Sequence, residues 1–223
     1  MPEDHHGFDE FTFQTDSWRI FRILSEFVDG FETLVELGPS VSLFGSARIQ
    51  KGHPFYVLSM EVAKAITEKG FSLITGGGPG LMEAANEGAQ IAGGKSCGLG
   101  VQVPYEKDLN AFIDPAYKLK FRYFFIRKVM FIRYAQGFVF LPGGYGTMDE
   151  LFEALTLIYT KKIAPFPIFL VGKEYWEGLL DWIKKSVMGL GCLNPSEFSL
   201  IQVSDDPNEI AQTIDQHYRQ NQT

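Results

Sequence analysis

The segment LPGGYGTMDE, residues 141–150, places a glycine-rich turn directly before an acidic pair. Glycine has no side chain, so a turn rich in it lets main-chain N–H groups approach an anion closely. The apolar residues after Thr147 have helical spacing, and the first turn of a helix adds unpaired N–H donors and the positive end of its dipole. Phosphate is the anion that such a turn suits best, and Glu150 would stand beside it.

Two more turns have the same character. FGSAR occupies residues 44–48 and TGGGPG occupies residues 75–80. One glycine turn is weak support for a phosphate site, because tight connections need glycine anyway, but three favour it. The predicted binding residues in the three turns are Gly45, Ser46, Gly77, Gly78, Gly143, Gly144, Gly146 and Thr147. Ser46 either donates to the phosphate or completes its turn. The turns match neither GxxxxGK[ST] nor GxGxxG, so the sequence predicts a different type of nucleotide site.

Thr147 and Glu150 also have a purely structural interpretation. Thr-x-x-Glu at a helix start is a capping box, with Thr147 as the N-cap and Glu150 reaching back to the backbone of the N-cap. Spacing alone favours this cap. The two interpretations are compatible, because a carboxylate that points back at the turn could also reach a ligand bound there.

The elements that position these turns alternate in type along the chain. Helical spacing of apolar residues predicts helices at about 18–37, 54–69, 80–92, 122–135, 147–160, 176–187 and 207–218. Short apolar runs predict strands at 41–44, 71–75, 95–103, 137–141, 167–171 and 199–203. Residues 104–120 are irregular and predict a long functional loop with an extended piece near 117–120. The alternation predicts an α/β fold, a Rossmann-like and mostly parallel sheet with helices on both faces, in which ligands bind beyond the carboxyl ends of the strands.

Composition excludes several classes of protein. The 223 residues, 45% hydrophobic and 14% aromatic, predict a flexible tail over residues 1–16 and a single domain over 17–223. A formal charge of −7 argues against binding to nucleic acid or to an anionic membrane. We expect no membrane span or signal peptide. Cys97 and Cys192 are too few for a disulfide framework or a four-cysteine zinc site, which favours the cytoplasm. No metal or cofactor is predicted.

Three features together resemble the LOG (Lonely Guy) family of cytokinin riboside 5′-monophosphate phosphoribohydrolases, often labelled "possible lysine decarboxylase". They are LPGGYGTMDE, the pair Arg127-Lys128 on the preceding helix, and TGGGPGLMEAANEGA. The resemblance extends from about Trp18 into the C-terminal helices. The family motif PGGxGTxxE is matched at every fixed position, by Pro142, Gly143, Gly144, Gly146, Thr147 and Glu150. WRIFRILSEFVDGFETL and FGSAR resemble the longer bacterial branch of the family.

The resemblance implies hydrolysis of the N-glycosidic bond of an adenosine-type 5′-monophosphate, which gives free base and ribose 5-phosphate. It assigns the catalytic roles to Arg127 and Glu150. Glu150 would favour the positive charge that develops on the ribose ring, and could orient the ribose hydroxyls or the attacking water. Arg127 would contact either the phosphate or the departing base. Lys128 points about 100° away from Arg127 on a helix, so it is either a further substrate contact or a residue in solvent or at a subunit contact.

Other polar residues near the turns have weaker assignments. Glu83 and Asn86 share roughly one helix face and could contact the ribose. They are explained equally well as a first-turn acid and a polar surface residue. Asp149 should face away from Glu150, and we interpret it as a helix-start charge. The aromatic residues around Arg127 favour a core or a subunit interface over stacking on adenine. The resemblance implies a homo-oligomer, a dimer or larger.

Two other functions fit parts of the sequence. A lysine decarboxylase needs a pyridoxal phosphate Schiff-base lysine with partners for the phosphate and the ring nitrogen, and we identify no such set. A nucleotide or molybdenum-cofactor binding or carrier protein that does not hydrolyse its ligand would have a similar glycine cradle. The combination of Arg127 with Glu150 favours the hydrolase. The sequence does not distinguish AMP from isoprenylated adenine nucleotides as the substrate.

Overall fold

The structure is a computed structural model that describes residues 16–102 and 108–222. The predicted tail, residues 1–16, lies outside these ranges except for Asp16, at which the first helix begins. The first part of the predicted loop, residues 103–107, also lies outside them.

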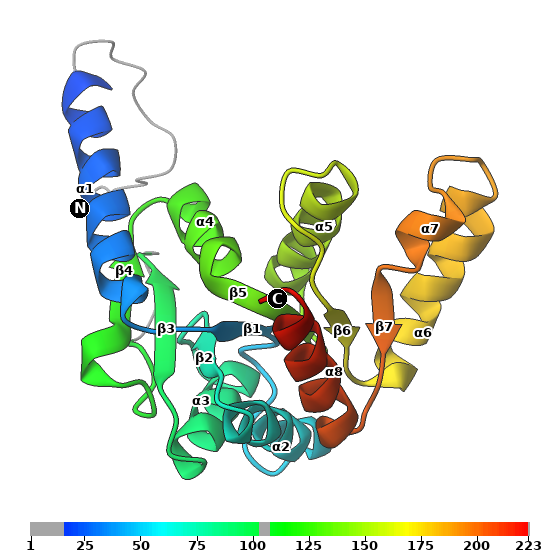
Figure 1. Cartoon of the computed structure of the whole chain (residues 1–223), viewed down its shortest axis with the longest axis horizontal. Coiled ribbons are helices and arrows are strands. Elements are labelled where there is room, and N and C mark those ends of the chain that lie inside the picture. Colours follow the sequence, from blue (N-terminus) through cyan, green and yellow to red (C-terminus); the bar gives the residue numbers. More distant parts are fainter. Residues whose placement is uncertain (1–15, 103–107, 223) are drawn as a thin grey trace, which may run out of the picture.

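One seven-stranded sheet forms the centre of the described chain (Figure 1). All strand pairs are parallel, in the order β4-β3-β2-β1-β5-β6-β7. The strands are β1 (Ser40–Phe44), β2 (Ser72–Thr75), β3 (Ser96–Val101), β4 (Lys118–Phe121), β5 (Ala135–Phe140), β6 (Ile168–Leu170) and β7 (Ile201–Val203). The six predicted strands are confirmed, and the extended piece near 117–120 is the edge strand β4. Its exposed lysines, Lys118 and Lys120, discourage pairing with another sheet.

Helices cover both faces of the sheet, as predicted (Figure 1). One face carries α2 (Pro54–Glu68), α3 (Leu81–Ile91) and α8 (Pro207–Gln220). The other carries α1 (Asp16–Val35), α4 (Phe124–Tyr134), α5 (Tyr145–Tyr159) and α6 (Lys173–Trp182). The π-helical turn Ile183–Met188 extends α6, and the short helices Pro115–Tyr117 and α7 (Pro195–Phe198) lie in connections. Successive residues of β5 enter opposite cores, because side chains alternate across a strand.

The strand order reverses at β1 and β5, which determines where a ligand can bind. From β1 the chain continues through α2 to β2 on one side, and from β5 it continues through α5 to β6 on the other. Because α2 and α5 cover opposite faces, the carboxyl ends of these two strands open a crevice. Hydrogen bonds from Leu141 N to Phe44 O (2.8 Å) and from Ser46 N to Pro142 O (2.9 Å) join the two turns at its base.

Helix α1 presents apolar residues on two sides. On the inner side Leu34 is fully buried and Phe27 contacts Phe125 of α4. Gly30 lies so close to Met130 that an added Cβ would come within 2.6 Å of the Met130 Cε. On the outer side an exposed row is spaced alternately by three and four residues, as in one stripe of a coiled coil. We call this row the α1 seam; it consists of Phe21, Leu24, Val28, Phe31 and Val35.

Candidate active site

A cavity of about 750 Å³ lies at the crevice between β1 and β5. The turns that follow these two strands form its rim, and α4, α5 and α6 contribute side chains to it. The predicted site residues that line it are Gly45, Ser46, Arg127, Gly143, Gly144, Gly146, Thr147 and Glu150. The predicted site residues that do not are Gly77, Gly78, Glu83, Asn86 and Lys128. Two of the three glycine turns therefore form most of one site.

Helix α5 begins two residues earlier than predicted, at Tyr145. Its N-cap is Gly144, which puts Thr147 at the third helical position and Glu150 in the second turn. The predicted capping box is therefore wrong. Glycine is itself an accepted N-cap, and the Thr-x-x-Glu spacing could not show that the helix would use it. Glu150 makes no cap, and its carboxylate faces the cavity instead.

Position 143 must be a glycine, because Thr147 of α5 lies too close to leave room for a side chain. A Cβ added at Gly143 would lie 2.0 Å from the Oγ1 and 2.5 Å from the Cβ of Thr147, whereas one added at Gly144 would meet nothing within 4 Å.

We expect Gly143→Ala to lower the free energy of unfolding by about 1–3 kcal/mol through overpacking, and Gly144→Ala to lower it far less. Urea unfolding measures both values. Equal losses in the two variants would contradict this role of Gly143.

Helix α6 supplies a residue that the sequence analysis missed. The Tyr175 hydroxyl donates a hydrogen bond to the Gly143 carbonyl at 2.5 Å, and the side chain lines the cavity. This bond fixes the peptide between Gly143 and Gly144, and with it the direction of the Gly144 N–H. Tyr175 lies shortly after β6, the strand next to β5, so adjacency in a parallel sheet was the signal that could have found it.

The turn after β1 adds two further side chains that were not predicted, Arg48 and His53. The Ser46 hydroxyl accepts a hydrogen bond from the Arg48 N–H at 3.1 Å, which completes the turn and leaves the hydroxyl proton for another partner. His53 is the N-cap of α2, and its Nδ1 accepts from the Phe55 N–H at 3.1 Å. Arg48 brings positive charge to the rim of the cavity and was visible within the FGSAR segment.

The turn after β2 contributes less than predicted. From this turn and the start of α3, the residues that line the cavity are Gly76 and Met82. Asn110 covers the next two glycines, because its Nδ2 donates to the carbonyls of Gly77 at 3.2 Å and Gly78 at 3.1 Å. Gly77 has a φ of +72°, a backbone conformation that favours glycine. These glycines therefore serve the packing of a neighbouring loop segment.

Asn86 is fully buried beneath that turn. Its Oδ1 accepts from Thr75 Oγ1 at 2.7 Å and from Asn110 Nδ2 at 2.9 Å. Its Nδ2 donates to Ser96 Oγ at 2.8 Å and to Cys97 O at 3.3 Å. The amide has two donor and two acceptor positions, and protein groups occupy all four. Asn86 thus braces β2, β3 and Asn110 rather than offering its amide to a ligand in the cavity.

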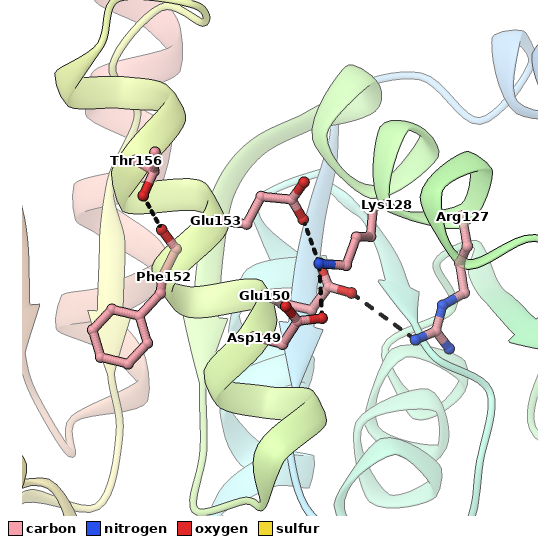
Figure 2. A network of polar contacts seen from close by, with 7 residues as sticks. All are labelled: Arg127, Lys128, Asp149, Glu150, Phe152, Glu153 and Thr156. Atoms are coloured by element: carbon pink, nitrogen blue, oxygen red, sulfur yellow. Dashed lines mark hydrogen bonds and ion pairs between the residues drawn. The ribbon is translucent and has the colours of Figure 1, made fainter.

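Arg127 and Glu150 come together in the cavity from two different helices (Figure 2). The Arg127 Nη2 and the Glu150 Oε1 are 3.9 Å apart, and the side chains are 15% and 4% exposed. The guanidinium lies 5.2 Å from the ring centre of Phe124 and 5.6 Å from that of Phe131, and these cation–π contacts restrict its position. Since 3.9 Å exceeds the length of a charge-assisted hydrogen bond, a ligand can compete for this ion pair.

Burial controls the protonation of Glu150. Removal from water raises the pKa of its carboxyl group from 4.5 to about 7, and the nearby Lys128 and Arg127 oppose this rise. The carboxylates of Glu153 and Asp149 add a smaller upward effect on the same pKa. A pKa near neutral pH suits a group that exchanges a proton with water or with a substrate.

Two predicted contacts, Lys128 and Glu83, lie away from the cavity lining. The Lys128 Nζ is 2.7 Å from the Asp149 Oδ2 and 2.9 Å from the Glu153 Oε2, so it joins α4 to α5 (Figure 2). Asp149 is therefore an ion-pair partner. The prediction that it is a helix-start charge is wrong, because α5 begins at Tyr145 and its first turn holds no acidic residue. Glu83 stands in the first turn of α3, as its structural interpretation requires.

Within residues 16–102 and 108–222, no group of three or more His, Cys, Asp or Glu side chains could hold a metal ion. Among the helices of the same two ranges, none is long and apolar enough to cross a membrane.

Comparison with known proteins places this site in a family. A family model described as "Possible lysine decarboxylase" matches residues 82–214, more than half of the chain and the part that carries Arg127 and Glu150. The chain belongs to this family, the LOG family. One LOG relative, a cytokinin riboside 5′-monophosphate phosphoribohydrolase from Mycobacterium tuberculosis, is 30% identical over 151 residues, which cover 67% of this chain and 79% of the relative. An uncharacterized protein from Archaeoglobus fulgidus is 32% identical over 125 residues, 55% of this chain and 78% of the relative.

Solved structures share the fold of this LOG protein. The molybdenum cofactor carrier protein of Chlamydomonas reinhardtii superposes with a TM-score of 0.59 over 82% of this chain and 99% of that one, at 22% identity. The molybdenum cofactor binding protein of Rippkaea orientalis gives a TM-score of 0.55 over 83% of this chain and 98% of that one, at 17% identity. Identities this low show the common fold alone.

Proposed function

We propose that this LOG protein hydrolyses the N-glycosidic bond of adenosine-type riboside 5′-monophosphates, including cytokinin nucleotides, to the free base and ribose 5-phosphate. The observation that carries the proposal is the arrangement of Arg127 and Glu150 in one cavity, beside the glycine turn that begins α5. Relatives at 25–30% identity that are named as phosphoribohydrolases of this kind support the same reaction.

The cavity offers a place for each part of the substrate. The 5′-phosphate would accept hydrogen bonds from the N–H groups of Gly144, Tyr145 and Gly146, at the positive end of α5, with Arg48 and Ser46 in the adjoining turn after β1. The ribose would then lie near Glu150, one helical turn further along. The base would extend toward the apolar and aromatic side chains of the lining.

The reaction breaks the bond between the ribose C1′ and the base nitrogen. The bonding electron pair leaves with the base, which takes up a proton, and a water oxygen forms the new bond to C1′. The ionised carboxylate of Glu150 would stabilise the positive charge on the ribose ring in the transition state and accept a proton from the water. Arg127 would hold the phosphate or the departing base in place.

Two other functions receive less support. The likeness to molybdenum cofactor proteins is one of fold, and a carrier has no need for a buried carboxylate beside an arginine in its site. A decarboxylase that uses pyridoxal phosphate needs a lysine side chain among the residues that line the cavity, to form the Schiff base. The charged and histidine side chains that line it are Arg48, His53, Arg127 and Glu150, and no lysine from the described ranges is among them.

The test is chromatographic. The purified protein is incubated with AMP and, separately, with isopentenyladenosine 5′-monophosphate, and the mixtures are analysed for free base and ribose 5-phosphate. The proposal expects both products in equal amounts from at least one nucleotide, and the two rates rank the substrates. Intact nucleotide in both incubations would reject the proposed hydrolase for adenosine-type substrates.

We further propose that the chain forms a homo-oligomer, a dimer or larger, and that the α1 seam is one of its contacts. A surface helix of a monomeric protein rarely exposes five large apolar side chains at coiled-coil spacing, because burying these side chains against a partner is favourable. Charge along α1 suits an antiparallel pair: Arg19 and Arg22 lie in its first half, and Asp29, Glu32 and Glu36 lie in or just after its second half. The free thiols of Cys97 and Cys192 support a cytoplasmic setting for the assembly.

Val28→Glu, in the middle of the α1 seam, is expected to reduce the molar mass of the particle, because a buried unpaired charge destabilises an apolar contact. Light scattering after gel filtration measures the mass. Val57→Glu is the matched control, since Val57 is an exposed valine on α2, across the sheet from α1. A monomeric wild-type protein, or a Val28→Glu particle of wild-type mass, would contradict this use of the seam.

A further inference from the structure

A tight group of ions lies directly behind the proposed catalytic pair. The Lys128 Nζ is 2.7 Å from the Asp149 Oδ2 and 2.9 Å from the Glu153 Oε2 (Figure 2). We call these three residues the Lys128 clamp. The Lys128 side chain is only 18% exposed, and it does not line the cavity. Its partners are more exposed, Glu153 at 31% and Asp149 at 57%, so water and salt weaken part of the attraction within the clamp.

The clamp and the catalytic pair share the same two stretches of chain. Arg127 and Lys128 are adjacent on α4, and Asp149 and Glu150 are adjacent on α5. Asp149 and Glu153 are one turn apart, so they present two carboxylates on one side of α5 to the same ammonium group. The clamp is therefore close-packed, with contacts under 3 Å, while the adjacent pair of Arg127 and Glu150 stands 3.9 Å apart.

The charges around Glu150 are nearly balanced before its own ionisation. From α4 it faces Arg127 and Lys128, and from α5 it has Asp149 and Glu153 as neighbours. Arg48 and His53 line the same cavity from the turn after β1. Glu150 is thus the third carboxylate of a group that contains two cations. Among the neighbouring charges, Lys128 has the largest effect on the pKa of Glu150 and lowers it.

We propose that Lys128 is a positioning residue for the hydrolase: its ion pairs hold α4 against α5 at the distance that Arg127 and Glu150 require, and its charge favours the ionised form of Glu150. The proposal rests on the proposed function for its kinetic consequences. Its electrostatic part concerns the protein alone and can be measured without turnover.

The kinetic test compares the pH dependence of kcat/KM for AMP in three variants. Lys128→Met removes the charge and keeps much of the stem, Lys128→Arg keeps the charge, and Asp149→Asn opens the clamp by removing a carboxylate. In Lys128→Met we expect the acid limb of the profile to move to higher pH by about one unit, with a loss of about fivefold at pH 7 that narrows at higher pH. In Asp149→Asn the acid limb should move to lower pH, because a negatively charged neighbour of Glu150 is lost.

The acid limb moves to higher pH in Lys128→Met and to lower pH in Asp149→Asn, and these opposite shifts distinguish the proposal from a purely structural role of Lys128. A lysine that only stabilises the fold would lower activity equally at every pH in both variants, and unmoved acid limbs would overturn the proposal. Lys128→Arg should keep the wild-type limb. Lys64→Met is the matched control, because it removes an exposed pair with Glu68 on the opposite face of the sheet. If Lys128→Met does not fold, Lys128→Gln, which also removes the charge but keeps a polar end for Asp149 and Glu153, takes its place in the comparison.

A second readout needs no catalysis. Protein labelled with ¹³C in the glutamate carboxyl groups is titrated by NMR, with Glu150→Gln used to assign the Glu150 signal. The Glu150 midpoint should be higher in Lys128→Met than in the wild type and lower in Asp149→Asn. Unchanged midpoints overturn the electrostatic role of Lys128. Shifted midpoints in a protein that releases no base from AMP would keep this role and reject the proposed hydrolase.

Discussion

Glu150→Gln is expected to reduce kcat for AMP hydrolysis by about a thousandfold or more, because the variant loses both the negative charge beside the ribose and the proton acceptor for water. Glutamine has nearly the same shape, so the cavity should persist and the variant should still bind AMP. The comparison uses initial rates of base release, and calorimetry for binding. Glu61→Gln, an exposed glutamate of α2, is the control and should retain the wild-type rate. Undiminished activity in Glu150→Gln would remove this residue from the mechanism.

The same variant carries a stability signature. Because the pKa of Glu150 is raised in the folded protein, the folded state binds more protons than the unfolded state between pH 4.5 and about 7. The wild type therefore loses stability as the pH rises through this window, by about 3 kcal/mol from a shift of about 2.5 units. Glu150→Gln lacks this titration. It should match the wild type near pH 4.5 and exceed it by about 3 kcal/mol at pH 8.5 in urea unfolding. Parallel pH profiles for the two proteins would show that burial does not perturb Glu150.

Arg127→Met is expected to lower kcat/KM for AMP by about 10²–10³-fold, the usual effect of removing one charged donor that contacts the reacting molecule. Methionine keeps the apolar stem between Phe124 and Phe131, so the loss reports on the charge. Arg127→Lys should recover little of the activity, because a lysine cannot reproduce the planar fork of the guanidinium. Steady-state kinetics across AMP concentrations separates a loss in kcat from a rise in KM, and so distinguishes a contact to the departing base from a contact to the phosphate.

Arg133→Met is the control for that substitution. Arg133 lies in the last turn of α4 and is exposed, so it shares the helix with Arg127 and has no part in the cavity lining. It should keep the wild-type kcat/KM. Equal kinetics for Arg127→Met and Arg133→Met would show that Arg127 has no role in the reaction.

The sequence was sufficient for most of the fold because its elements have strong and distinct periodicities. The central strand runs are short, mostly apolar and buried, as expected for strands covered on both faces, and the helices between them have a clear 3.6-residue pattern. The start of α5 was misplaced because Gly144 and Gly146 are residues typical of turns. In the structure, the hydrogen bond from the Met148 N–H to the Gly144 carbonyl shows that the helix has already begun.

The site was predictable in outline and less so in its individual side chains. The position of the turns after β1 and β5 follows from sheet topology, and the resemblance to the LOG family supplied Arg127 and Glu150. Asn86 could not be classified, because its four hydrogen-bond partners come from Thr75, Ser96, Cys97 and Asn110, which are distant in sequence. Tyr175 and the partners of Lys128 are likewise set by tertiary packing. The exposed α1 seam has the spacing of a buried face, so the sequence could not show that it would face outward.

The most direct test of the central claim is a single-turnover experiment, with the protein in excess over AMP at pH 8. When the protein concentration also exceeds the Kd for AMP, nearly every nucleotide is bound, so one cleavage per site is enough to be seen by chromatography. The account predicts complete conversion to adenine and ribose 5-phosphate in equal amounts by the wild type, and intact AMP with Glu150→Gln under the same conditions. AMP that remains intact while bound to the wild-type protein would contradict the proposed hydrolase and favour a protein that binds its nucleotide without cleaving it.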